Sequence, residues 1–138
     1  MSQLEYLDTN VFIRHITQDE PQMAERARRL FKQLEAGQAT ATTCEGVIVE
    51  AVQVLASRAL YHLPRPLIRQ HLSNLLSLKG LRLPRKRVYL RALDLYATSS
   101  LDFVDALIVA HMERDRSTVV ISFDEDFDRL SQISRREP

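Results

Sequence analysis

The stretch Leu4-Glu5-Tyr6-Leu7-Asp8-Thr9-Asn10 is the strongest indication of how this 138-residue chain folds. Its first four residues have the length and apolar content of a short strand. Asp, Thr and Asn side chains bond to nearby backbone groups and favour turns, so residues 8–10 predict a corner between a strand and a helix. Such a corner places an acid at the carboxyl end of the strand, where ligands bind in parallel α/β sheets.

The rest of the chain alternates between helical and strand patterns. Helices are predicted over residues 21–37, 44–60, 64–78, 85–97 and 102–114, and strands over 38–42, 81–83, 119–122 and 133–136. The pair Thr42 and Glu45 has the spacing of a capping box at the start of the second helix. The alternation favours an α/β fold, which we expect to be a three-layer α/β/α sandwich on a short parallel sheet of about five strands, in a single domain over residues 1–138.

Composition excludes several classes of protein. The chain is 45% hydrophobic and 27% charged, as ordinary globular domains are. No apolar run approaches the ~20 residues that span a bilayer, and residues 1–5 do not resemble a secretion signal. The one cysteine, Cys44, has no partner for an internal disulfide, which favours a reducing compartment. We therefore expect a cytoplasmic protein that is not bound to a membrane.

Positive charge is concentrated in the middle of the chain. The net charge is only +1, but residues 51–93 hold nine bases and no acid, whereas residues 94–138 hold ten acids and five bases. A solvated basic face explains this pattern, and so does a rim that binds phosphates beside an acidic centre. The second explanation is the arrangement expected of a nuclease.

Four acids are candidates for a functional site. Asp8 and Asp124 follow predicted strands, Asp105 lies at the start of a predicted helix, and Glu50 lies on a largely apolar helix. Structural alternatives exist for three of them, since Asp8 suits an Asx turn, Glu50 an exposed polar stripe and Asp124 a helix cap. Asp102 is also explained by capping. Carboxylates that cluster raise one another's pKa unless a cation joins them. A cluster of these acids therefore predicts a divalent ion, Mg²⁺ or Mn²⁺.

Other chemistries lack their parts. The four histidines have no zinc-type spacing, and the sequence contains no phosphate-binding glycine loop and no Gly-x-Ser-x-Gly motif. A haloacid-dehalogenase-like phosphatase needs a second aspartate at the position of Asn10, and a response-regulator receiver needs a late lysine, whereas no lysine follows Lys86.

Four short strings, taken in order, resemble the motifs of the PIN-domain ribonucleases, and within them of the VapC-like toxins. They are residues 7–12 (LDTNVF), 48–55 (IVEAVQVL), 102–108 (DFVDALI) and 121–127 (ISFDEDF). The resemblance implies that Asp8, Glu50, Asp105 and Asp124 bind the metal and catalyse, that Asn10 and Ser122 support them, and that Asp102 is an auxiliary acid. Ser122 replaces the usual threonine but keeps its hydroxyl.

The resemblance implies a Mg²⁺- or Mn²⁺-dependent endoribonuclease, a homodimer inhibited by a small antitoxin protein as the toxin of a VapBC-type pair. The alternative is a PIN scaffold that binds RNA or protein without cutting it. If RNA is the substrate, the candidates for holding its phosphates come from the basic middle of the chain: Arg58, Arg65, Arg69, Arg85, Lys86 and Arg87.

Overall fold

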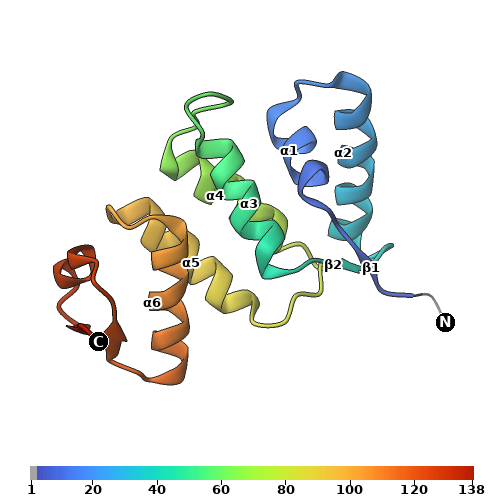
Figure 1. Ribbon diagram of the computed structural model, residues 1–138. Helices are drawn as coiled ribbons and strands as arrows, with labels where there is room; N and C mark the ends of the chain where they lie inside the picture. Colours follow the sequence, from blue (N-terminus) through green and yellow to red (C-terminus); the bar gives the residue numbers. More distant parts are fainter. Residues whose placement is uncertain (1–2) are drawn as a thin grey trace. The chain divides into compact units, whose positions relative to one another are not determined.

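The computed structural model describes residues 3–138, and the chain divides into two compact units, one ending at Lys86 and one running from Arg87 to Pro138. The elements of the first unit are β1 (Glu5–Tyr6), α1 (Thr9–Thr17), α2 (Pro21–Ala36), β2 (Ala41–Thr42), α3 (Glu45–Ala56) and α4 (Arg65–Leu76) (Figure 1). Those of the second are α5 (Lys86–Thr98, beginning at the boundary), α6 (Phe103–Asp115), β3 (Val119–Ile121), the short 3₁₀ helix η1 (Glu125–Arg129) and β4 (Ser134–Arg136). The predicted α/β class is confirmed, while the single domain and the three layers stay predictions.

The prediction of one sheet of about five strands is wrong. In the described residues the strands form two short parallel pairs, β1 with β2 and β3 with β4. The predicted strand over 81–83 contributes only a bridge from Leu81 to Ala41. It ends there because Pro84 follows at once and has no N–H to donate to a ladder. Helices begin within three residues of β1 and β2, which keeps these two strands short.

The helix α2 shows why periodicity predicted the helices well. Pro21 stands in its first turn, where a missing N–H costs nothing. Gly37 ends it in the left-handed conformation at φ 73°, which glycine adopts without strain. The apolar stripe faces α1, and the rings of Phe12 and Phe31 lie 5.6 Å apart between the two helices, which stand side by side in Figure 1.

The start of α3 differs from the sequence prediction. Cys44 is its N-cap residue and makes no side-chain capping bond, while Thr42 belongs to β2 and its hydroxyl donates to the Thr43 carbonyl. The predicted capping box is therefore wrong. The helix ends at Ala56, four residues earlier than expected, because Ser57 has an extended backbone.

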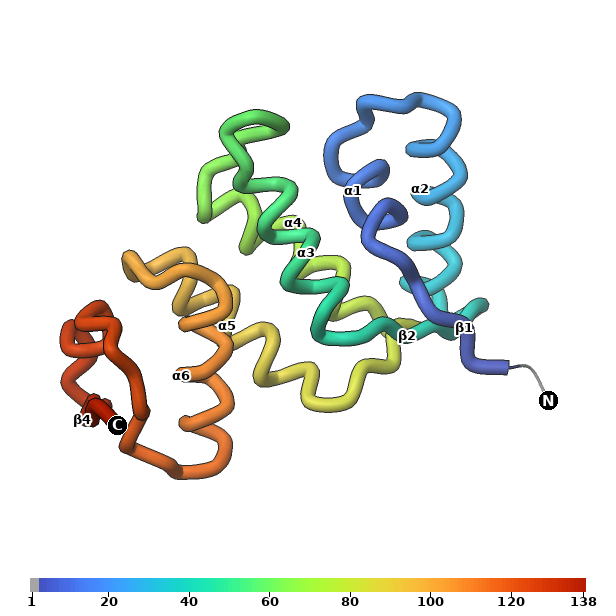
Figure 2. The backbone as a smooth tube through the Cα atoms, viewed as in Figure 1, coloured from blue at the N-terminus to red at the C-terminus, as the bar shows by residue number. Residues whose placement is uncertain are grey.

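In the second unit, α5 and α6 bury aromatic and aliphatic side chains, and Tyr96 meets Phe103 edge to face at 5.8 Å between ring centroids. After α6 the chain forms β3, turns through η1 and returns as β4, as the tube in Figure 2 shows. None of the helices within residues 3–138 combines the length and the apolar character that crossing a membrane requires.

Gly80 provides a test of the packing in the first unit. A Cβ atom there would lie 2.2 Å from the Ala39 carbonyl oxygen and 2.8 Å from that of Leu34, both of which are backbone atoms. The Gly80 N–H also donates to the Leu34 carbonyl at 2.7 Å, so the backbone cannot move away without losing this bond. We predict that Gly80→Ala lowers the free energy of unfolding by about 3 kcal/mol, the upper part of the range for overpacking, as measured by urea denaturation.

Gly46→Ala is the matched control. Gly46 is exposed near the start of α3, and a Cβ atom there meets nothing within 4 Å. Alanine favours the helix over glycine by up to about 1 kcal/mol, so this variant should be at least as stable as the wild type. Equal urea midpoints for Gly80→Ala and the wild type would contradict the close approach at Gly80.

Candidate functional site

Asp8 lies at the corner that the sequence predicted. Its backbone is extended (φ −89°, ψ 164°), and its Oδ1 accepts a hydrogen bond from the Thr9 N–H at 2.8 Å as the N-cap of α1. The side chain thus bonds the N–H of the next residue, whereas the Asx turn considered for Asp8 requires the N–H two residues on. An ionised carboxylate has about four acceptor positions, and the Asp8 side chain is exposed, so capping is compatible with binding a cation.

Thr9 connects the first motif to the second. It is only 5% exposed, and its hydroxyl donates to Oε2 of Glu50 at 2.8 Å, which joins α1 to α3. The end of β1 is held nearby, because the Thr43 hydroxyl donates to the Leu7 carbonyl at 2.9 Å. The first unit therefore brings Asp8 and Glu50 to the two sides of one threonine. From sequence Thr9 was predicted only as part of the turn at residues 8–10, and its place between two polar turn residues was the available signal for a larger role.

Asn10 follows on the first turn of α1. It is exposed and lines an apolar hollow between α1 and α2, together with Val11 and Met23. Its supporting role stays a prediction.

In the second unit, Asp102 caps α6, and its Oδ1 accepts a hydrogen bond from the Asp105 N–H at 2.9 Å. The backbone of Asp102 is extended (φ −71°, ψ 172°), as an N-cap requires. Asp105 thus stands in the first turn, between the buried side chains of Phe103 and Ala106 in sequence, and is itself half-buried. The cap fixes the turn from which the Asp105 carboxylate projects.

Asp105 is the most perturbed acid of this unit. Burial raises its pKa, and the negative charges of Asp102, Asp124 and Asp126 raise it further, to about 6. The N-terminal end of a helix favours a negative charge, so burial and repulsion outweigh that help here. Asp105 is a carboxylate whose negative charge is poorly compensated by the protein.

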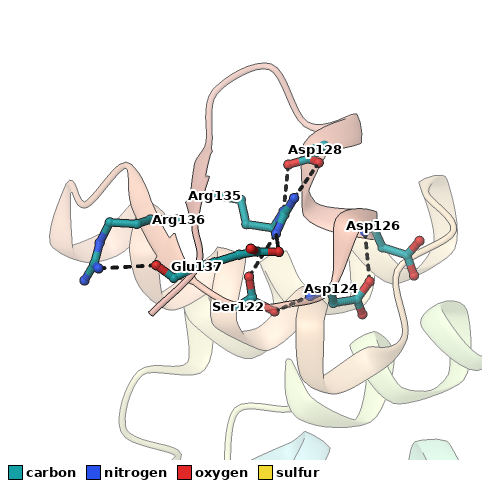
Figure 3. A network of polar contacts seen from close by, with 7 residues as sticks. All are labelled: Ser122, Asp124, Asp126, Asp128, Arg135, Arg136 and Glu137. Carbon is teal, nitrogen blue, oxygen red and sulfur yellow. Dashed lines mark hydrogen bonds and ion pairs between the residues drawn. The ribbon is translucent and has the colours of Figure 1, made fainter.

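The segment from Ser122 to Asp128, which we call the acidic turn, supplies two of those charges. The Ser122 hydroxyl accepts a hydrogen bond from the Asp124 N–H at 2.9 Å, and Asp124 Oδ1 accepts one from the Asp126 N–H at 2.8 Å (Figure 3). The capping alternative for Asp124 is thus present, and Ser122 contacts the backbone of one of the four acids, while its supporting role stays a prediction. Asp126, interpreted from sequence as a solvated acid, was missed as a neighbour of Asp105.

The basic candidates lie in varied positions. Arg58 and Arg87 are exposed, Arg65 and Arg69 are half-buried on α4, and Arg85 is exposed with a left-handed backbone at φ 60°. The Lys86 ammonium donates to the Leu81 carbonyl at 2.5 Å, and burial lowers its pKa. Lys86 is therefore the least suited of the six to bind a phosphate, and RNA binding by all of them stays a prediction.

The donors around Asp105 fit a hard divalent cation. Among residues 3–138 no three His, Cys, Asp or Glu side chains converge closely enough to hold an ion by themselves. Mg²⁺ does not need such a cage, because it keeps several waters and commonly binds one or two carboxylates. The neighbours of Asp105 offer carboxylate oxygens, which suit Mg²⁺ and Mn²⁺. A cation there would also relieve the repulsion.

Comparison with known proteins identifies the family. A search of curated proteins finds no match. The family model described as PIN domain matches residues 6–133, a range that includes Asp8, Glu50, Asp105 and Asp124. PIN domains are in general nucleases, and divalent ions are their usual cofactors. This match over nearly the whole length confirms the resemblance at the level of the family, and the chain belongs to the PIN domain family.

Proposed function

We propose that the protein is an endoribonuclease that depends on Mg²⁺ or Mn²⁺, with Asp8, Glu50, Asp105 and Asp124 as its metal-binding acids. The observation that supports this most is the half-buried Asp105, whose pKa is raised by burial and by the negative charges of three further acids. Like charges at a half-buried position cost free energy unless a cation neutralises them. A nuclease of this family uses that cation in its chemistry.

The residues of the chain would position the reacting groups. Thr9 holds the Glu50 carboxylate, Ser122 holds the Asp124 backbone, and Asp102 fixes the first turn of α6 through the Asp105 N–H. A bound Mg²⁺ or Mn²⁺ supplies the activation of a water and the stabilisation of negative charge on the phosphodiester oxygens. The exposed arginines among the basic candidates would hold flanking phosphates of the RNA, with an affinity that falls as salt rises.

The biological setting is a finer part of the same proposal. The order of the four motifs is similar to that of VapC-like toxins, so we propose a cytoplasmic toxin of a VapBC-type pair, acting as a homodimer and inhibited by a small antitoxin protein. The competing proposal is a PIN scaffold that binds RNA or protein without cutting it. The presence of all four acids favours the enzyme, because a scaffold does not require them.

The first prediction for this function concerns Asp124. Asp124→Asn keeps a side chain that can cap η1 but removes a negative charge from the proposed metal site. Cleavage of a fluorescent single-stranded RNA in Mn²⁺ should fall by at least about 100-fold, since even outer neighbours of a metal cost 10- to 100-fold when replaced. Excess EDTA should abolish the wild-type activity.

Asp94→Asn, on the exposed face of α5, is the charge-matched control and should cleave as the wild type does. If the wild type cleaves RNA equally well in excess EDTA, the metal-dependent mechanism is wrong. If it binds RNA but never cleaves it in Mg²⁺ or Mn²⁺, the scaffold is correct.

The second prediction concerns Asp105 in the metal-free protein. Its pKa of about 6 in the folded state lies above its ordinary value of 3.8, so between these pH values the folded state binds the proton more tightly than the unfolded state. Stability should therefore fall as pH rises through this window, and the loss should be complete above pH 6. Asp105→Asn removes the charge and should melt above the wild type at pH 7.5 in EDTA. This advantage should shrink as pH is lowered to 4.

Saturating Mn²⁺ should reverse the order, because the metal stabilises the wild type more than the variant. We compare the melting temperatures of wild type, Asp105→Asn and Asp94→Asn in EDTA and in Mn²⁺. Asp94→Asn should keep the full metal-induced rise in melting temperature. An Asp105→Asn variant that melts below the wild type in EDTA at pH 7.5 and keeps the same rise would show that Asp105 is structural.

A further inference from the structure

The acidic turn concentrates negative charge in a short segment. Within the five residues 124–128 it contains four acids, Asp124, Glu125, Asp126 and Asp128, and its only regular structure is the short helix η1. Repulsion between these carboxylates favours an open conformation of the turn. Arg129 pairs with Asp126 at 3.8 Å on the exposed side, which is a weak restraint. A stronger restraint comes from β4.

Arg135 contacts both ends of the acidic turn. Its Nε and Nη2 atoms donate to the two oxygens of Asp128 at 3.0 and 3.2 Å, and Nη1 donates to the Ser122 carbonyl at 3.1 Å (Figure 3). Nη1 also lies 3.2 Å from Oε1 of Glu137. The Arg135 side chain is 14% exposed, whereas that of Asp128 is 52% exposed, so the restraint rests on the fork geometry of the guanidinium and not on burial of the ion pair.

The position of Arg135 is fixed by the strand that contains it. β4 pairs with β3 in a parallel register that places Arg135 beside Val120, and the Ser122 N–H donates to the Arg136 carbonyl at 3.0 Å. The planar guanidinium then binds a carboxylate through two donors and keeps a third for a carbonyl. A lysine presents one point charge and does not reproduce this fork.

The restraint passes from Arg135 to Asp124 without direct contact. Arg135 holds the carbonyl of Ser122, and the hydroxyl of the same serine accepts from the Asp124 N–H at 2.9 Å. Asp124 in turn accepts from the Asp126 N–H at 2.8 Å. Because the far end of the turn is held at Asp128, the hydrogen-bonded Asp124 and Asp126 have little freedom to move apart.

We infer that Arg135 is a positioning residue: by clamping Ser122 and Asp128 it fixes the place of the Asp124 carboxylate, and it contacts neither metal nor RNA itself. The effect of Arg135 on catalysis rests on the proposed function, whereas its effect on the conformation of the acidic turn does not. Arg135 has two alternative roles, namely a contact to an RNA phosphate and an ion pair that only stabilises the fold. The experiment distinguishes both from positioning.

The experiment compares Arg135→Gln and Arg135→Lys with Arg136→Gln, which removes the same charge from the next residue of β4. The Arg136 side chain makes a long hydrogen bond, 3.4 Å from Nη1 to the Glu137 carbonyl, and points away from the turn (Figure 3). Mn²⁺ affinity is measured by calorimetric titration, and kcat and KM are measured with single-stranded RNA. Replacing an outer partner of a metal ligand typically costs about 10- to 100-fold, and we expect that loss in Mn²⁺ affinity and kcat for Arg135→Gln.

KM for RNA should stay within about twofold for every variant, since Arg135 makes none of the phosphate contacts on which RNA affinity depends. Arg135→Lys should recover part of the loss, and Arg136→Gln should behave as the wild type. A raised KM with unchanged Mn²⁺ affinity would show that Arg135 contacts phosphate, and would overturn the inference. A lower melting temperature with unchanged Mn²⁺ affinity and kcat would show a structural pair, and would overturn it as well.

A second measurement decides the question even if the wild type neither binds Mn²⁺ nor cuts RNA, in which case the proposed function fails. Amide hydrogen exchange of metal-free protein, followed by NMR, reports the bonds from the Asp124 and Asp126 N–H groups directly. Arg135→Gln should speed exchange at both amides while amides within α6 keep the wild-type rate, and Arg136→Gln should leave both unchanged. Unchanged exchange in Arg135→Gln would overturn the inference.

Discussion

Repulsion between carboxylates is the constraint on which the second unit depends. Asp105 is half-buried at the start of α6, and the charges of Asp102, Asp124 and Asp126 act on it together with burial. A protein that needed only a folded helix could replace Asp105 by a neutral residue and lose nothing in capping, because Asp102 is the cap. The arrangement is understandable if a divalent cation compensates these charges when the enzyme works.

The other polar contacts of the unit maintain this unfavourable arrangement. The Asp102 cap fixes the first turn of α6, and Ser122 and Asp124 use backbone N–H groups to hold the acidic turn closed. Arg135 supplies positive charge at the turn without reaching Asp105. In the first unit the neutral hydroxyl of Thr9 restrains the Glu50 carboxylate through a hydrogen bond. Glu50 and Asp124 are thus oriented by neutral hydrogen-bond donors, a hydroxyl and a backbone N–H, in the way that outer partners commonly orient metal ligands.

Sequence alone predicted the helices and the acids better than the sheet. Apolar periodicity and end signals such as Pro21 and Gly37 are local, so α2 was predicted to within a residue. Strands depend on distant partners, and Pro84 leaves residues 81–83 with one bridge. Asp126 was missed because an acidic run does not reveal which of its negative charges raise the pKa of Asp105. Arg135 was missed because its contact with Ser122, 13 residues away, follows no spacing rule.

The most direct test of this account is an NMR titration of the Asp105 side-chain carboxyl carbon, with and without Mg²⁺. In metal-free protein the account predicts a midpoint near the pKa of about 6 that burial and the neighbouring acids produce. Saturating Mg²⁺ should lower that midpoint, because a cation beside the carboxylate favours its ionised form. An unshifted midpoint near 4 that does not respond to Mg²⁺ would contradict both the repulsion and its role in binding metal.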